Sequence, residues 1–160
     1  MIFASVGTQL PFPRLLETLH RLVDTLDVDV LAQTIDSAYT YTSKGRLRCV
    51  MSLSPSDYDT HAASARILIA HAGIGSIITA AKHQKPIILF PRRSHLGEHR
   101  NDHQSETIRR FGDEPGIHVA TSWQELVTLV SSELLPRPPL TAANSSLVSG
   151  IRDFIWNRAP

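Results

Sequence analysis

The amino-acid sequence predicts a single α/β domain of the Rossmann-like type, with a mostly parallel sheet of about six strands. Short runs of apolar residues alternate with helical patterns along the chain, and this alternation is typical of a parallel sheet covered by helices. The run Ile67–Ala70 is wholly apolar, as a strand buried on both faces is expected to be. The 160 residues, of which 42% are hydrophobic, suffice for one domain with a full core.

The first half of the chain supplies four of the expected strands and two helices. We place the strands at residues 2–6, 28–33, 47–53 and 67–70. After the first strand, leucines recur at helical spacing, at positions 15, 19, 22 and 26. Pro13 suits the first turn of that helix. Pro55 and Asp57 begin a short second helix that ends before Arg66.

The second half of the chain continues the alternation. Strands are expected at 86–90 and 117–120, and helices after the turn at 71–76 and at about 102–110. Ser122, with Glu125 three residues later, predicts a capping box at the start of another helix. We place the body of the domain at residues 1–135. Residues 136–160 form a proline-rich linker and a C-terminal helix of the same domain, with Leu147, Ile151 and Ile155 on its apolar face.

Composition and charge exclude several classes of protein. Sixteen Lys and Arg against fifteen Asp and Glu leave a formal charge of +1, which provides no basic surface for nucleic acid. Cys49 is the only cysteine, which fits a reducing compartment. The N-terminus does not resemble a signal peptide. The sequence contains no run of about 18 apolar residues, the length needed to cross a bilayer. We therefore expect a cytoplasmic protein that reaches a membrane only peripherally.

The turn His71–Ser76, with the sequence HAGIGS, is the strongest candidate for a binding motif. It joins a buried strand to a helix, and the N–H groups at a helix start attract anions, helped by the helix dipole. Gly73 and Gly75 would let the backbone approach a ligand, and Ser76 adds a hydroxyl donor. Such turns lie at the carboxyl ends of the strands, where ligands bind. Glycines that serve only close packing remain an alternative.

Two polar segments are expected at the same edge of the sheet. Residues 6–9, VGTQ, follow the first strand and offer N–H and hydroxyl donors, although a plain strand-to-loop turn would look the same. Residues 91–104 are mostly polar, and their carboxylate, amide and imidazole groups suit a polyhydroxyl ligand such as a sugar. The alternative there is a solvated loop in which Asn101 or Asp102 caps the next helix.

These motifs together resemble the C-terminal domain of glycosyltransferase family 28. The matching segments are VGT at 6–8, HAGIGS at 71–76, KP at 85–86 and NDHQ at 101–104. The resemblance runs from Met1 to about Gly112 and is closest to the stand-alone members of the family. These are single-domain subunits of split transferases that act in lipid-linked oligosaccharide, exopolysaccharide or capsule synthesis, and the segment GEHRNDHQ at 97–104 is similar to theirs in full.

The resemblance implies the C-terminal half of a GT-B enzyme. The chain would be the donor-binding catalytic subunit of an inverting transferase, moving a hexose-type sugar from a UDP-sugar to a lipid-linked or polysaccharide acceptor. A membrane-anchored partner subunit would bind the acceptor at the cytoplasmic face of the membrane. No cofactor and no metal are expected, because a helix N-terminus can stabilise the departing diphosphate and no carboxylate cluster has metal-ligand spacing.

Site residues carry over position by position. Those expected near the diphosphate are Gly7, Thr8, His71, Gly73, Gly75 and Ser76. Those expected to face the donor sugar are Asn101, His103 and Gln104. In many relatives an acidic residue eight positions after the histidine holds the ribose, but Thr79 stands there in this chain, so that contact is weakened or supplied elsewhere.

Some roles stay open at the level of the sequence. An acceptor hydroxyl needs a general base, for which Glu98 and His99 are the nearby candidates unless the partner supplies it. Arg92 and Arg93 stand where they could recognise an acidic donor such as a uronic acid, or equally meet phosphate or solvent.

Two other functions compete with the transferase. The first is a non-catalytic nucleotide-sugar-binding or regulatory module, which Thr79 favours. The second is a zinc peptidase, because HLGEH at 95–99 fits the H-x-x-E-H pattern and His103 adds a third imidazole. That chemistry needs both histidines on one continuous helix, and Gly97 inside the pattern favours a loop instead.

Overall fold

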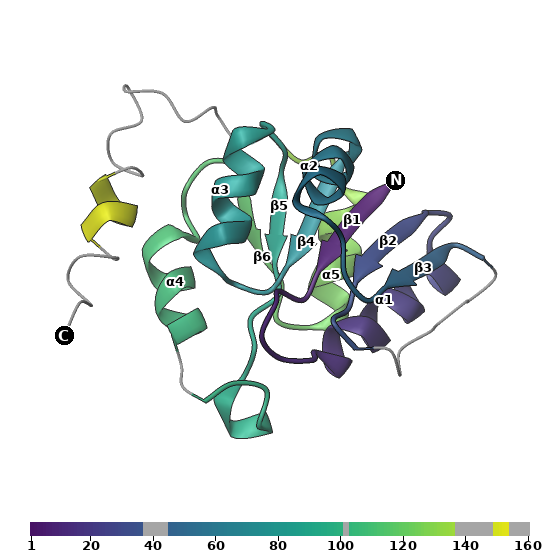
Figure 1. The fold of residues 1–160 in the computed structure, drawn as a ribbon, viewed down its shortest axis with the longest axis horizontal. Coiled ribbons are helices and arrows are strands. Elements are labelled where there is room, and N and C mark those ends of the chain that lie inside the picture. Colours follow the sequence, from purple (N-terminus) through teal and green to yellow (C-terminus); the bar gives the residue numbers. More distant parts are fainter. Residues whose placement is uncertain (37–44, 101–102, 137–148, 154–160) are drawn as a thin grey trace.

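A computed structural model describes residues 1–36, 45–100, 103–136 and 149–153 of the chain. Within these residues, six strands form one sheet in the order β3-β2-β1-β4-β5-β6, and every neighbouring pair is parallel (Figure 1). The strands are β1 (Ile2–Ser5), β2 (Val30–Gln33), β3 (Leu47–Val50), β4 (Ile67–Ala70), β5 (Ile87–Leu89) and β6 (Ile117–Val119). The predicted α/β fold is confirmed. Its strand order is that of a Rossmann domain, in which a crevice opens between β1 and β4.

Helices cover both faces of this sheet. On one face, α1 (Pro13–Thr25) and α5 (Trp123–Ser131) pack against a core cluster that includes Ile69. On the other, α2 (Pro55–Ser64), α3 (Ile74–Lys82) and α4 (His103–Phe111) contribute to a second cluster with Leu68. β4 is therefore buried from both sides, which explains its wholly apolar sequence. None of the helices within the described ranges is long and apolar enough to cross a membrane.

Local signals place the helix starts. Pro13 occupies the first position of α1, as expected for a residue without an N–H. The Ser54 hydroxyl caps α2 by accepting from the Asp57 N–H at 3.1 Å. At α5 the predicted capping box is present: Ser122 accepts from the Glu125 N–H, and the Glu125 carboxylate accepts from the Ser122 N–H.

Several strands are shorter than the apolar runs that predicted them. The second begins at Val30, not at residue 28, and the third ends at Val50, not at residue 53. A strand extends only as far as its partners do, and Val50 is paired with Gln33, the last residue of β2. Hydrophobicity along the chain carries no information about where that pairing stops. Similarly, the helix expected at 102–110 spans His103–Phe111.

The C-terminal segment is described only in part. Residues 149–153 are helical, and Ile151 packs against the second core cluster. Asp153 lies close to α4, with its Oδ2 3.8 Å from Arg110 Nη2. Leu147 and Ile155, expected on the apolar face of this helix, lie outside the described residues. The division between residues 135 and 136 stays a prediction.

Replacing Ser122 with alanine tests the capping box. Loss of the Ser122 hydroxyl leaves the Glu125 N–H without its cap, so the free energy of unfolding should fall by about 1 kcal/mol in urea denaturation. Thr128→Ala is the matched control on the same helix, because that hydroxyl donates only to the Gln124 carbonyl one turn earlier. It should change stability by less than about 0.5 kcal/mol. Equal losses in the two variants would contradict a specific role for the cap.

Candidate functional site

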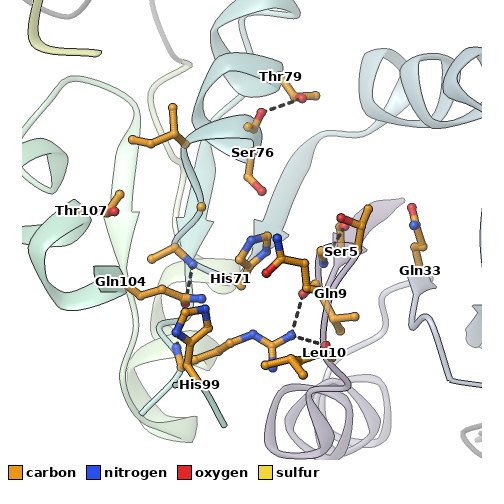
Figure 2. A pocket seen from close by; sticks show the side chains of 18 of the residues that line it. Ser5, Gln9, Leu10, Gln33, His71, Ser76, Thr79, His99, Gln104 and Thr107 are labelled. Atoms are coloured by element: carbon orange, nitrogen blue, oxygen red, sulfur yellow. Dashed lines mark hydrogen bonds between the residues drawn. The ribbon is translucent and has the colours of Figure 1, made fainter. Parts of the chain in front are cut away.

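A cleft of about 660 Å³ opens at the carboxyl ends of the strands, a volume within the range of small-molecule sites. Its walls come from the loop after β1, the end of β2, the turn between β4 and α3, and the start of α4 (Figure 2). The predicted site residues that line it are Gly7, Thr8, His71, Gly73, Gly75, Ser76, Thr79, His99, His103 and Gln104. Glu98 is not among the lining residues. Asn101 lies outside the described residues.

The N-terminus of α3 faces this cleft. Gly73 is the N-cap, and the Ser76 N–H bonds to the Gly73 carbonyl at 3.1 Å. The amides of Ile74 and Gly75 come before any carbonyl that the helix could offer them. The first turn therefore presents N–H groups and the positive end of the helix dipole to the cleft. This is the arrangement expected of an anion site.

The His71 imidazole fills the space that two glycines leave. A Cβ atom on Gly7 would lie 2.7 Å from His71 Cε1, and one on Gly73 would overlap His71 Nε2. Gly7 also has a φ of +92°, which a side chain rarely permits. Gly75 has open space around it. Gly7 and Gly73 thus both accommodate the histidine ring and also line the cleft, and their place near a diphosphate stays a prediction.

His71 is held in its neutral form. Burial, together with the charge of Arg92, lowers the pKa of His71 from 6.5 to about 4. The imidazole is therefore uncharged at neutral pH, with one ring nitrogen able to donate a hydrogen bond and the other able to accept one. The fixed positive charge beside it belongs to Arg92, whose pKa burial lowers to about 10, so that Arg92 stays protonated.

Arg92 anchors the loop that carries Gly7 and Thr8. The side chain is only 4% exposed, and its guanidinium lies 4.4 Å from the centre of the Phe12 ring. It donates to three carbonyls of the β1–α1 loop, those of Val6 (2.8 Å), Leu10 (2.5 Å) and Pro11 (2.5 Å). Arg93 donates to the Thr121 carbonyl at 2.8 Å. Both arginines donate to main-chain carbonyls, and recognition of an acidic donor by them stays a prediction.

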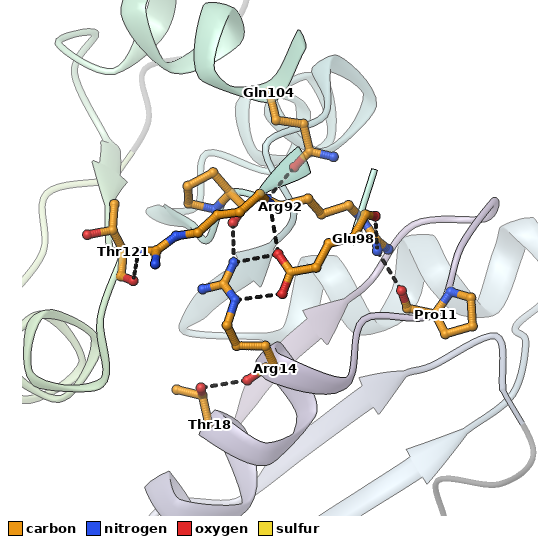
Figure 3. A network of polar contacts seen from close by, with 9 residues as sticks. Pro11, Arg14, Thr18, Arg92, Glu98, Gln104 and Thr121 are labelled. Atoms are coloured by element: carbon orange, nitrogen blue, oxygen red, sulfur yellow. Dashed lines mark hydrogen bonds and ion pairs between the residues drawn. The ribbon is translucent and has the colours of Figure 1, made fainter. Parts of the chain in front are cut away.

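Glu98 forms a second connection, between the segment after β5 and the start of α1. Arg14 donates to both carboxylate oxygens, at 2.7 and 2.8 Å, and the Arg93 N–H donates at 2.7 Å (Figure 3). Burial opposes ionisation of Glu98, but these bonds lower its pKa below the ordinary value. A carboxylate so engaged, and outside the lining of the cleft, is not placed to remove a proton from an acceptor. Of the two candidate bases, only His99 lines the cleft.

Gln104 connects the turn after β4 to the segment after β5. Its Oε1 accepts from the Ala72 N–H at 3.1 Å and from the Arg92 N–H at 2.9 Å. The side chain is 6% exposed and lines the cleft, as does His103 in the preceding position. The carbonyl end of Gln104 is therefore structural, whereas its Nε2 group still has two hydrogens to donate.

Thr79 stands next to a tyrosine that the sequence did not single out. The Thr79 hydroxyl donates to the Gly75 carbonyl at 2.9 Å. Burial raises the pKa of Tyr58, and hydrogen bonds with Ser5 and Thr79 partly offset this. Tyr58 and Ser5 both line the cleft. Three hydroxyl groups thus gather where the resemblance leads us to expect a single acidic side chain.

Gln33 is a further lining residue that the sequence reasoning missed. It ends β2, whose sequence is VLAQ, and it is 6% exposed. The available signal was a polar residue at the end of an otherwise apolar buried strand. His71, which follows the apolar β4, carries the same signal.

The zinc-peptidase alternative lacks the helix that it needs. His95 lies in a short 3₁₀ turn, η1 (Ser94–Leu96), and Gly97 ends that turn with a left-handed φ of +70°. His95 and His99 are therefore not on one continuous helix. In the part of the chain that the structure describes, no three His, Cys, Asp or Glu side chains are grouped to hold a metal ion.

Fold and site together define a Rossmann-like ligand-binding domain, with its cleft at the switch point of a parallel sheet. The model of the glycosyltransferase family 28 C-terminal domain matches residues 31–146, more than half of the chain. The chain therefore belongs to this family and is a glycosyltransferase domain. No curated protein matches the sequence of this chain significantly.

Several solved structures share this fold at low sequence identity. The solution structure of ALG13 matches with a TM-score of 0.61 and 17% identity, over 92% of this chain and 93% of that one. MurG from Acinetobacter baumannii matches with a TM-score of 0.59 and 17% identity, over 81% and 40%. A UDP-glucose: anthocyanidin 3-O-glucosyltransferase in complex with UDP matches with a TM-score of 0.63 and 12% identity, over 99% and 36%. The chain thus corresponds to about two fifths of each of the last two.

Gly73→Ala and Gly75→Ala form a matched pair that tests the seating of His71. The new methyl at position 73 would displace the imidazole, so stability should fall by about 1–3 kcal/mol. The methyl at position 75 meets open space within α3 and should be neutral or stabilise the helix by up to about 1 kcal/mol. Thermal denaturation, with the His71 ring resonances as a local probe, checks both. The proposed seating is wrong if Gly73→Ala is as stable as wild type and leaves the ring resonances unchanged.

The depressed pKa of His71 has a consequence for stability. Unfolded His71 titrates near 6.5 and folded His71 near 4, so the unfolded state binds more protons in that range. The contribution of His71 to stability is complete above pH 6.5 and is lost as the pH falls toward 4. An NMR titration of the ring Cε1–H should give a midpoint near 4. A midpoint near 6.5 would show that the imidazole is solvated and free of Arg92.

Proposed function

We propose that this chain is the donor-binding catalytic subunit of an inverting UDP-sugar glycosyltransferase. The observation that carries the proposal is the positive end of α3 facing a cleft whose lining also includes the buried cation Arg92. Such a cleft suits the diphosphate at the middle of a nucleoside diphosphate sugar. The similar fold of a glucosyltransferase solved in complex with UDP gives support.

The leaving group is the charge that catalysis has to stabilise. An acceptor hydroxyl attacks the anomeric carbon, the C–O bond to the diphosphate breaks, and its electron pair leaves with UDP. We propose that the first-turn amides of α3 bind the developing charge. Arg92 acts there through its charge, because both of its terminal nitrogens already donate to main-chain carbonyls. Neutral His71 donates a hydrogen bond to the same diphosphate, with Thr8 and Ser76 nearby in the lining.

The two sugars of the donor fall on opposite sides of the diphosphate. We assign the transferred sugar to His103 and the Nε2 of Gln104, at the start of α4, with Asn101 added by the family resemblance. We assign the ribose to the hydroxyl groups of Thr79 and Tyr58. His99, which lines the cleft, is the base candidate within this chain. No cofactor or metal is required by this scheme.

Acceptor binding is assigned to a second polypeptide. We propose a membrane-anchored partner subunit, a lipid-linked or polysaccharide acceptor, and a hexose-type donor, with the reaction at the cytoplasmic face of the membrane. The support is the resemblance to split transferases. The similar ALG13 structure is of comparable size, since the match covers 93% of that chain.

One observation favours a non-catalytic nucleotide-sugar-binding or regulatory module instead. Thr79 replaces the acidic residue that many relatives have at this position. Calorimetry with UDP and a panel of UDP-sugars, followed by transfer assays with the partner present, separates the two functions. We expect binding by this chain alone and transfer only in the complex. Binding without transfer in the complex would favour the module, and no binding to any nucleoside diphosphate would contradict both.

Gln104→Glu separates the structural end of this side chain from its ligand-binding end. A carboxylate can still accept from the Ala72 and Arg92 N–H groups, but it cannot donate to a sugar hydroxyl. We expect a stable protein whose transfer rate falls roughly tenfold or more, as for a lost hydrogen bond to the substrate. Gln124→Glu, an exposed site on α5, is the control and should keep full activity. Full activity in Gln104→Glu would remove this residue from the sugar site.

A further inference from the structure

Gln33 carries a buried polar atom that nothing in the described protein satisfies. The side chain is 6% exposed, and its Oε1 is buried with no hydrogen-bond partner among the described residues. Buried carbonyl groups in folded proteins are almost always hydrogen-bonded to protein, water or ligand. Because Gln33 lines the cleft, a bound ligand is the natural source of the missing donor.

The position of Gln33 determines which part of a ligand it can meet. It pairs in register with Ser5 of β1, and β1 separates it from β4 and the turn at His71. Figure 2 shows Gln33 on one side of His71 and Gln104 with Thr107 on the other. Gln33 therefore lies at the opposite end of the cleft from the proposed sugar site.

The ends of a nucleoside diphosphate sugar are its transferred sugar and its nucleobase. With the diphosphate at α3 and the sugar beside Gln104, the base falls at the end of the cleft where Gln33 lies. The same end is lined by Leu53, Pro55 and Tyr58, whose apolar surfaces suit the faces of a planar ring. A flat ligand that is apolar on its faces and polar at its edge matches this set of residues.

We propose that Gln33 is a specificity-determining residue that recognises the edge of the uracil base. The Gln33 Oε1 accepts from the N3–H of uracil, and its Nε2 donates to an adjacent ring carbonyl. Cytosine has no hydrogen at N3, so its binding leaves the Gln33 carbonyl unpaired, and a site built to pair with a donor discriminates against such an analogue. This inference rests on the proposed function, because it assumes that the cleft holds a nucleoside diphosphate.

Binding of UDP, CDP and inorganic pyrophosphate to the full chain tests the proposal by calorimetry. Wild type should prefer UDP over CDP by roughly tenfold or more. Gln33→Met, of similar size but without polar atoms, should reduce that preference to about threefold or less while leaving pyrophosphate affinity unchanged. The unliganded variant should melt no lower than wild type, because no protein hydrogen bond to Oε1 is lost.

Two further variants sharpen the result. Gln9→Met removes another glutamine of the same cleft and should alter UDP and CDP binding equally, so that the preference for UDP persists. Gln33→Glu keeps an acceptor but loses the donor, and it provides the same measurement if Gln33→Met does not fold. An intermediate preference is expected for it.

The outcomes distinguish this inference from the function on which it rests. If wild type binds UDP but both Gln33 variants keep the full preference over CDP, the role of Gln33 is wrong and the proposed function stands. Equal binding of UDP and CDP by wild type also overturns the role of Gln33. If wild type binds neither nucleotide, the proposed function fails and this inference fails with it.

Discussion

The site depends on one buried cation. Arg92 follows β5, yet its guanidinium binds carbonyls of the loop after β1, and Phe12 covers it. Removing the side chain would leave these carbonyls without donors in a protein interior, where unpaired polar groups are costly. Arg92 therefore fixes the loop that holds Gly7 against His71. Burial and the same charge together keep His71 neutral, so Arg92 contributes both to the shape of the cleft and to its protonation state.

The described residues of the polar stretch at 91–104 are divided between this scaffold and the lining of the cleft. The Arg93 side chain donates to a main-chain carbonyl, and the Glu98 carboxylate accepts from Arg14 and from the Arg93 N–H. His99 and His103, in contrast, line the cleft. Gln104 does both. Density of polar residues alone did not separate these roles, because a carboxylate that orders a loop and one that accepts a proton look the same in a sequence. Position relative to the cleft separates them.

The fold was predictable because its signals are local. The run Ile67–Ala70, the proline at the start of α1 and the box at Ser122 each act within a few residues, and all three are confirmed. The errors concern partners far along the chain. Arg14 and Glu98 are 84 positions apart, and Arg92 and Val6 are 86 apart. The unsatisfied carbonyl of Gln33 likewise becomes visible only when the neighbouring strands are in place.

The charge arrangement of the cleft suits the release of a diphosphate in the proposed reaction. Because His71 is neutral, the positive potential comes from Arg92 and the amides of α3, and both are fixed by the fold before any ligand arrives. Groups already oriented toward the developing charge need not reorganise during the reaction, which is the condition for strong electrostatic stabilisation. A protonated His71 would add charge, but at the expense of burying a second cation beside Arg92. Because burial and Arg92 lower the pKa of His71, the ring stays neutral at neutral pH and this second buried charge does not form. The neutral imidazole, held between Gly7 and Gly73, can still donate a hydrogen bond.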